Sequence, residues 1–305
     1  MKFKVLTFLL ILSVLFVTAG TGPPAVTASP GAEAPDLGTA ASFVGLAGST
    51  FTNTGSGVYY GNVGVYPGTA VIGFPPGEVR DGAIYGGGAV PMQAQIDAAT
   101  AYNALALQSC DTNLTDQNLG GQTLQPGVYC FDTSAQLTGD LVLDALGDAN
   151  AVWVFKIGST LTTASGATVG LINGGQALNV FWQVGSSATL GTTTLFSGNI
   201  LAYQSITLDT GAGLVGRALA LNGAVTMDTN GSPPITNAPT YTLTVNIVGQ
   251  GNVTAEPPGT VILPPGTMLF PYTFISGTVV TLEAVPAALW YFAGWSGDLG
   301  GSANP

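Results

Sequence analysis

The sequence contains no histidine, and charged residues make up only 7% of its 305 residues, compared with roughly 25% in an average soluble domain. Histidine is the commonest general base, so the absence of histidine excludes Ser-His-Asp and Cys-His catalytic arrangements. Beyond Lys4, only Arg80, Lys156 and Arg217 are basic, and the formal net charge is −11. Nucleic-acid binding needs clustered Lys and Arg side chains, so a nucleic-acid partner is excluded.

Cysteine is almost as scarce, with only Cys110 and Cys130 present. If the chain is exported, we expect these two to form a disulfide, which would stabilise the fold by roughly 3 kcal/mol. A pair of buried free thiols is the alternative. Two cysteines without histidine do not complete a zinc shell, so we expect no metal and no cofactor.

The N-terminus has the features of a secretory signal. Lys2 and Lys4 precede an apolar segment, residues 5–17, that is too short to span a bilayer comfortably. We expect a signal peptide over residues 1–28, an extracellular protein, and a flexible Gly/Pro/Ala-rich linker over residues 29–35. An uncleaved membrane anchor is the alternative.

Residues 36–231 have the pattern of many short β-strands separated by Gly, Asn and Ser turns. The phrases "ATLGTTTL", "SITLDTGAG" and "AVTMDTNG" begin at Ala188, Ser205 and Ala224, and "STLTTASG" begins at Ser159. A period near 18 residues fits three short strands and three turns, the coil of a triangular β-solenoid. The longer first interval predicts one coil with an inserted strand and turn.

One segment, residues 90–108, interrupts the β pattern. It lacks glycine, is rich in alanine, and has a proline at a position that a first helical turn tolerates. We expect one long helix packed alongside the solenoid. Its apolar stripe is predicted to comprise Met92, Ile96, Ala99, Ala106 and Leu107.

The fifty residues 159–208 contain no charge and are rich in Thr, Ser, Gly and Ala. Threonine favours strands and presents a hydroxyl and a methyl group together. Stacked in successive coils, such residues would form a flat face over which water can order, because no charge imposes its own hydration shell. Ordered water or ice is therefore one candidate ligand. A generic polar exterior on a surface or adhesive solenoid is the alternative.

The only cluster of acids is Asp140, Asp144 and Asp148 in "GDLVLDALGDAN". Asp140 and Asp144 would share one face of a strand and could mimic a paired-carboxylate or calcium site. A solvated turn shaped by Asp148 and Asn150 is the simpler interpretation, and we favour it. We therefore expect no enzyme and no small-molecule substrate.

Three stretches of the sequence carry a resemblance to a known family: "LGTAASFVGLAGSTFTNTGSGVYYGNVGVYPGTAVIGFPPGEV", "LTDQNLGGQTLQPGVYCFDTSAQLTGDLVLDALGDANAVWVFKIGSTLTT" and "GRALALNGAVTMDTN". They resemble the microbial ice-binding protein family DUF3494. The resemblance implies a discontinuous right-handed triangular β-solenoid, with one helix along one face and a different flat face that adsorbs to ice. Such proteins inhibit ice growth and recrystallisation without covalent chemistry. We expect ice or ordered water as the partner of a monomeric protein.

Some members of that family carry a loose Thr-Ala/Gly-x-Thr/Asn motif on the ice-binding face. The nearest matches begin at Thr54, Thr163 and Thr210, and "LGTT" ends in Thr192 and Thr193. The resemblance therefore implies that the ice-binding residues are Thr54, Thr163, Thr192, Thr193 and Thr210. The three Thr-led copies have glycine where the motif has Thr or Asn.

After a linker over residues 232–240, the segment 241–305 contains alternating strands and resembles part of a bacterial surface repeat related to the internalin B-repeat. The resemblance implies a small, partial β-grasp-like domain, and the chain is expected to continue beyond it. This tail keeps open an alternative function, a cell-surface adhesion or matrix module that uses the solenoid as a scaffold.

Overall fold

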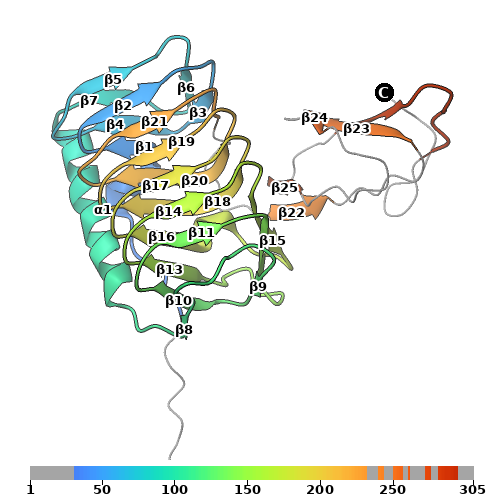
Figure 1. Ribbon diagram of the computed structural model, residues 1–305. Coiled ribbons are helices and arrows are strands. Elements are labelled where there is room, and N and C mark those ends of the chain that lie inside the picture. Colours follow the sequence, from blue (N-terminus) through green and yellow to red (C-terminus); the bar gives the residue numbers. More distant parts are fainter. Residues whose placement is uncertain are drawn as a thin grey trace, which may run out of the picture.

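The computed structural model describes residues 31–231, 240–243, 250–256, 260–261, 272–275 and 281–294. The expected signal peptide and much of the tail lie outside this part of the chain. Residues 38–227 form a stack of parallel β coils with one long helix beside it (Figure 1). The prediction of a mainly β fold with parallel sheets and one helix is confirmed.

Three sets of strands surround the core. The set beneath the helix comprises β7 (Ile84–Gly86), β4 (Asn62–Val65), β1 (Phe43–Ala47), β20 (Gly213–Ala220), β18 (Leu195–Ala202), β16 (Val180–Val184), β13 (Trp153–Ile157), β10 (Gly127–Phe131) and β8 (Thr112–Asn113). A second set comprises β9 (Thr123–Leu124), β12 (Asp140–Asp144), β15 (Thr168–Ile172) and the first halves of β18 and β20. β3 (Val58–Tyr60) and β6 (Glu78–Arg80) form a separate parallel pair.

The third set is a seven-stranded parallel sheet, which faces the viewer in Figure 1. Its strands, in spatial order, are β11 (Ala135–Leu137), β14 (Leu161–Thr163), β17 (Ala188–Leu190), β19 (Ile206–Leu208), β21 (Val225–Met227), β2 (Thr50–Asn53) and β5 (Ala70–Ile72). The N-terminal strands therefore continue the stack from its C-terminal coil: β2 pairs with β21, and β1 pairs with β20.

The coils have two lengths. Ala188 pairs with Ile206 and Ile206 with Val225, at offsets of 18 and 19 residues, whereas Leu161 pairs with Ala188 at an offset of 27. The prediction of one coil with an inserted strand is wrong, because two coils are long: Ala135 also pairs with Leu161, at an offset of 26. In the coil that begins at Leu161, a loop with the short 3-10 helix η2 (Ala177–Asn179) separates β15 from β16. In the shorter coils β18 and β20 run through the same corner as continuous strands.

Two stacked glycines allow this corner. Gly198 and Gly216 are paired in β18 and β20 and both have positive φ, 122° and 147°. A Cβ atom on Gly216 would lie 2.0 Å from the carbonyl oxygen of Gly198. Side chains are excluded here because strand backbones approach too closely.

Aromatic rings stack inside the coils. Tyr129, Phe155 and Trp182 occupy paired positions of β10, β13 and β16, and the Phe155 and Trp182 ring centroids are 3.9 Å apart. Phe196 continues this column at 4.8 Å from Trp182. Large buried rings supply much of the apolar area that stabilises a fold with so few charges.

Helix α1 (Ala89–Leu107) lies along the coil stack (Figure 1). Its buried residues include Ala94, Ala98, Ala101 and Leu105, which pack on the sheet beneath. The predicted stripe is wrong: Met92, Ile96 and Leu107 are 36%, 52% and 85% exposed. Small alanine side chains let the helix approach the sheet closely, and the larger side chains are left beside or away from the contact.

Polar contacts anchor the middle of this helix and the residue that follows its C-terminus. The Asp97 carboxylate accepts hydrogen bonds from the backbone N–H and the hydroxyl of Thr39, which lies in the 3-10 helix η1 (Gly38–Ser42). The ammonium group of Lys156 donates to the carbonyl oxygen of Gln108, just after the helix. Cys110 and Cys130 form the predicted disulfide, with their Cα atoms 5.9 Å apart, and so tie the segment after the helix to β10.

The described strands of the tail are antiparallel. β22 (Thr240–Leu243) pairs with β25 (Tyr272–Ile275), and β23 (Gly251–Glu256) pairs with β24 (Thr260–Val261) and with β26 (Thr281–Pro286). In the described part of the chain, no helix has the length and apolar character needed to cross a membrane.

Candidate functional site

The outer surface of the seven-stranded sheet carries a straight column of threonines. The pairing of β14, β17, β19, β21 and β2 brings five outward-facing threonines into register, one on each strand: Thr162, Thr189, Thr207, Thr226 and Thr52. Because neighbouring strands are about 4.8 Å apart, the column is about 19 Å long. We call the surface of these five strands the threonine face.

Alternation along each strand explains why these threonines face outward. Thr189 lies between Ala188 and Leu190, and both of these neighbours are buried in the core. The same apolar-Thr-apolar pattern occurs in Ile206–Leu208 and Val225–Met227. Successive side chains of a strand point to opposite faces, so burial of the neighbours fixes the threonine outward.

A second column of small side chains runs beside the first, one position before each strand begins or at its start. It contains Ser134, Thr160, Ser187, Ser205, Ala224 and Thr50. Its hydroxyls link successive coils: Thr160 Oγ1 donates to Ser134 Oγ at 2.8 Å, and Ser205 Oγ accepts from the Ala224 N–H at 3.1 Å. These bonds hold the surface rigid along the stack.

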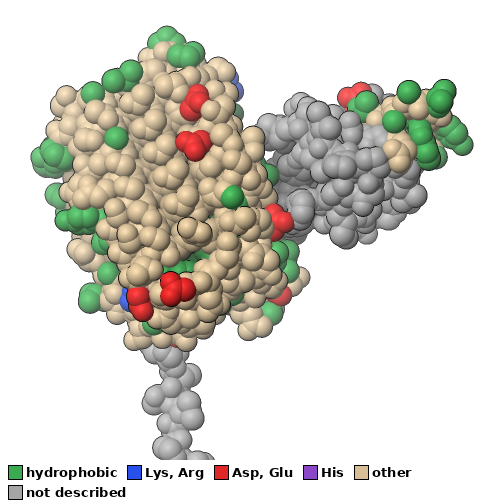
Figure 2. All heavy atoms as spheres, in the orientation of Figure 1, with side chains coloured by type: hydrophobic (Ala, Val, Ile, Leu, Met, Phe, Trp, Pro, Cys, Tyr) green, Lys and Arg blue, Asp and Glu red, His purple; other side chains and the backbone are tan. Residues whose placement is uncertain are grey.

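Figure 2 views this face directly and shows it mostly in tan, the colour of uncharged polar side chains and backbone. Neither column contains a charged residue. Asp209 and Asp228, which follow β19 and β21, lie at one margin of the face. The face therefore presents methyl and hydroxyl groups without a central charge that would bind its own hydration shell.

Four of the five predicted site residues lie at that same margin, in the corner turns that follow the strands. Thr54, Thr192, Thr193 and Thr210 are all exposed. Thr192 Oγ1 donates to Ser165 Oγ in the adjacent turn at 2.8 Å. The corner turns are thus polar and linked to one another, but they border the threonine column and are not part of it.

Backbone conformation explains the glycines of the predicted motif. Gly166, Thr193, Gly211 and Thr229 occupy successive corners with positive φ, from 53° to 72°. The N–H of Thr193 donates to the Thr210 carbonyl oxygen, and the N–H of Gly211 donates to that of Asp228. Glycine adopts this left-handed conformation without the strain that a β-branched residue carries, so Gly166 and Gly211 serve the turn.

Thr163 is the predicted site residue that the structure contradicts. It is the last residue of β14, it is only 4% exposed, and its hydroxyl is 2.8 Å from that of Thr194. It pairs with the buried Leu137 of β11, in the same register that pairs the outward-facing Thr162 with the exposed Gln136. Thr163 therefore belongs to the interior and cannot contact a ligand on the face.

The favoured solvated turn is found at Asp148 and Asn150, whereas Asp140 and Asp144 are the first and last residues of β12 and lie on one face of that strand. Asp140 accepts a hydrogen bond from Thr168 Oγ1 at 2.6 Å, and Asp148 accepts the N–H of Asn150 at 2.8 Å. The pKa of Asp144 is lowered by hydrogen bonds from Asn173 and the Leu146 N–H. Among the residues that the structure describes, no three His, Cys, Asp or Glu side chains gather as a metal site would require.

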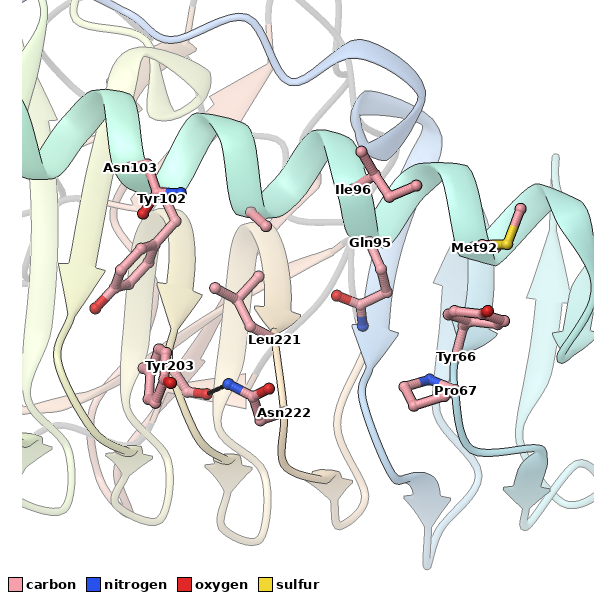
Figure 3. Close-up of a pocket in the computed structure, with 11 residues that line it drawn as sticks. Tyr66, Pro67, Met92, Gln95, Ile96, Tyr102, Asn103, Tyr203, Leu221 and Asn222 are labelled. Carbon is pink, nitrogen blue, oxygen red and sulfur yellow. Dashed lines mark hydrogen bonds between the residues drawn. The ribbon is translucent and has the colours of Figure 1, made fainter.

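A groove of about 460 Å³ lies between α1 and the adjacent corner turns (Figure 3). Met92, Ile96 and Ala99 of the predicted helix stripe line it. Tyr102 of α1 and Tyr203 of the turn after β18 face each other across it, with ring centroids 6.2 Å apart. The groove is apolar, carries no titratable group other than tyrosine, and lies away from the threonine face.

The central threonine column was missed in the choice of site residues, although its signal is present in the sequence. The repeated phrases contain it as Ala188-Thr189-Leu190, Ile206-Thr207-Leu208 and Val225-Thr226-Met227. A threonine between two residues that face the core is predicted to point outward. The Thr-Ala/Gly-x-Thr/Asn motif instead matches residues at the ends of strands of the seven-stranded sheet and in the turns that follow them.

The fold and this surface define a class of protein: a parallel β-coil stack with a flanking helix and a flat, uncharged face of hydroxyl side chains. A family model described as "Ice-binding-like" matches residues 45–232. The chain belongs to this family, and the resemblance to the ice-binding family inferred from the sequence is confirmed.

An ice-binding protein of Nostoc sp. (strain HG1) is 59% identical over 195 residues, which cover 64% of this chain and 72% of the relative. Among solved structures, an ice-binding protein from the Antarctic ascomycete Antarctomyces psychrotrophicus matches with a TM-score of 0.64 and 39% identity, covering 68% of this chain and all of that one. An ice-binding protein from an Antarctic biological consortium matches with a TM-score of 0.64 and 47% identity, covering 66% of this chain and 90% of that one.

Proposed function

We propose that this chain is a secreted ice-binding protein that adsorbs to ice through the threonine face, and thereby inhibits ice growth and recrystallisation. The observation that carries the proposal is the column of five threonines in register on a rigid, charge-free sheet. Membership of the ice-binding-like family supports the same activity.

The physical basis is the match between the face and ordered water. Each threonine offers a hydroxyl that can accept or donate one hydrogen bond and a methyl group over which water is already restricted. Parallel coils repeat these groups at about 4.8 Å, so the first water layer is ordered along the stack before ice arrives. A rigid face loses little conformational entropy on adsorption, because its side chains are already fixed. No covalent step is involved.

The test is growth of a single ice crystal in the presence of the full chain, with a recrystallisation assay on the same sample. The wild-type protein should facet the crystal and hold it without growth over a temperature gap. Thr207→Tyr, in the middle of the column, should abolish this activity because a large ring prevents the flat approach of ice.

Thr100→Tyr is the matched control. It introduces the same side chain at an exposed position of α1, and should leave the activity unchanged. Equal activity of folded Thr207→Tyr and the wild type would place the ice-binding surface elsewhere. A round crystal growing freely in folded wild-type protein would refute the activity itself.

The remaining features complete the proposal. We propose a signal peptide over residues 1–28, which directs secretion. Residues 36–231 are proposed to form a monomeric solenoid of right-handed triangular coils. The sequence and the family support both proposals. The tail over residues 241–305 is proposed to be a surface repeat that holds the ice-binding domain at the cell surface. Its sequence supports this, and its described strands are antiparallel, unlike those of the solenoid.

A further inference from the structure

One carboxylate at the margin of the threonine face gathers three hydroxyl groups from three different turns. Thr54 Oγ1 donates to Asp228 Oδ1 at 2.9 Å, Thr229 Oγ1 donates to the same oxygen at 3.2 Å, and Thr210 Oγ1 donates to Asp228 Oδ2. Thr54 follows β2 and Thr210 follows β19, so Asp228 lies between them in the stack.

The backbone around Asp228 is fixed by the same turns. The Thr54 N–H donates to the Met227 carbonyl oxygen at 2.9 Å, and the Gly211 N–H donates to the Asp228 carbonyl oxygen at 3.0 Å. The buried side chain of Asn230 donates to the carbonyl oxygens of Asp209 and Ala212. Asp228 therefore sits on a rigid corner, and the N-terminal segment meets the C-terminal coil there.

An ionised carboxylate can only accept hydrogen bonds. Thr210 therefore directs its single hydroxyl hydrogen toward Asp228. Thr54 does the same, because the Asp228 carboxylate at 2.9 Å is a nearer acceptor than the Met227 carbonyl oxygen at 3.4 Å. The oxygen lone pairs of both exposed hydroxyls remain for solvent. The three bonds to one carboxylate also hold its charge in a defined place, so that it does not compete for water at the face. Two hydroxyls are thus set as acceptors along one edge.

We propose that Asp228 is a positioning residue for ice binding: it orients the hydroxyls of Thr54 and Thr210 so that both accept hydrogen bonds from the water layer at the margin of the threonine face. The proposal rests on the function proposed above. It also gives Thr54 and Thr210, which lie outside the central column, a defined role beside it.

The test compares Asp228→Asn with wild-type full-length protein. The amide can donate as well as accept, so it no longer imposes one orientation on both hydroxyls. The concentration needed for half-maximal inhibition of recrystallisation should rise about fivefold, the change expected for one hydrogen bond of ordinary net strength. Asp209→Asn is the matched control, since Asp209 has the same charge one coil away, and it should match the wild type.

The pH profile separates orientation from a merely structural role. Hydrogen bonds from Thr210 and Thr54 lower the pKa of Asp228, so the wild-type activity should persist at neutral and mildly acidic pH and fall only at a pH below the ordinary titration range of aspartate. The titratable groups facing Asp228 in the described chain are Asp209 and the buried Tyr59. Asp228→Asn should show no such fall, and Asp209→Asn should retain it.

A second variant guards against misfolding of Asp228→Asn. Thr54→Val combined with Thr210→Val removes both hydroxyls and should give a similar loss, which adding Asp228→Asn does not enlarge. If folded Asp228→Asn equals active wild type at every pH, or Asp209→Asn loses as much, the positioning role is overturned and the proposed function stands. If the wild type itself does not arrest ice, the proposed function fails first, and this inference fails with it.

Discussion

The hydroxyl oxygens of Thr163 and Thr194 lie 2.8 Å apart in the interior of the coil stack, and both side chains are buried. Thr163 Oγ1 also accepts the buried N–H of Gly191 at 2.9 Å, and Thr194 Oγ1 contacts the Ala164 carbonyl oxygen at 3.2 Å. This small network ties one coil to the next where β17 enters its corner turn.

Thr163→Val should therefore reduce stability without reducing ice binding. Valine fills the same space but leaves the Gly191 N–H without its acceptor, which should cost about 1–3 kcal/mol of unfolding free energy. Urea unfolding followed by circular dichroism measures the loss. Ice activity should be assayed at a temperature where the variant is fully folded.

The neighbouring Thr162 provides the control. Thr162→Val changes an exposed side chain on the same strand, so the unfolding free energy should shift by no more than about 0.5 kcal/mol. A large loss of ice activity in Thr163→Val with unchanged stability would contradict the assignment of Thr163 to the interior.

These two adjacent threonines also show what the sequence can and cannot decide. Alternation predicts that Thr162 and Thr163 point to opposite sides, but "LTT" does not tell which one is buried. Pairing of Thr163 with the buried Leu137 and of Thr162 with the outward-facing Thr189 removes the ambiguity. Register between strands far apart in sequence is thus the information that the local pattern lacks.

The helix shows a second limit. Its boundaries follow from composition, and the structure places it over Ala89–Leu107, close to the expected residues 90–108. Its buried side was predicted wrongly because alanines occur all around the helix, so that the spacing of apolar residues does not single out one face. The sheet instead accepts Ala94 and Ala98, since only small side chains permit such close packing.

Gly216→Ala should strongly destabilise the solenoid. The added Cβ would meet the Gly198 carbonyl oxygen at 2.0 Å, and φ is 147°, which an L-residue adopts with strain. We expect a loss of about 3 kcal/mol or more, measured as a lower thermal midpoint.

Gly213→Ala is the control for this substitution, because Gly213 lies three residues before Gly216 on the same strand β20. A Cβ atom there would meet the nearest atom, Leu195 Cδ2, at 3.4 Å, which is ordinary contact. Its stability should stay close to that of the wild type. Similar stability of both variants would mean that the corner relaxes around a Gly216 side chain.

Replacing both Cys110 and Cys130 with serine should lower the unfolding free energy by about 3 kcal/mol, because the disulfide closes a loop with a sequence separation of 20 residues. The bond ties the end of α1 to β10, on the helix side of the stack. Ice activity of the folded variant should therefore be unchanged. Urea unfolding of the wild type with and without reductant should reproduce the difference, and equal midpoints would contradict it.

The Asp97 contact predicts how stability depends on pH. Hydrogen bonds from the Thr39 hydroxyl, the Thr39 N–H and Gln93 lower the pKa of Asp97 below its usual value. A carboxylate whose pKa is lower in the folded state stabilises the fold above its unfolded pKa, and this contribution is lost as the pH falls through the folded value. Asp97→Asn should therefore be less stable than the wild type at neutral pH, and the difference should shrink at acidic pH as the wild-type carboxylate is protonated. Urea midpoints of the two proteins across this range measure the effect. A difference that stays constant with pH would show that the charge of Asp97 does not hold α1 to the N-terminal segment.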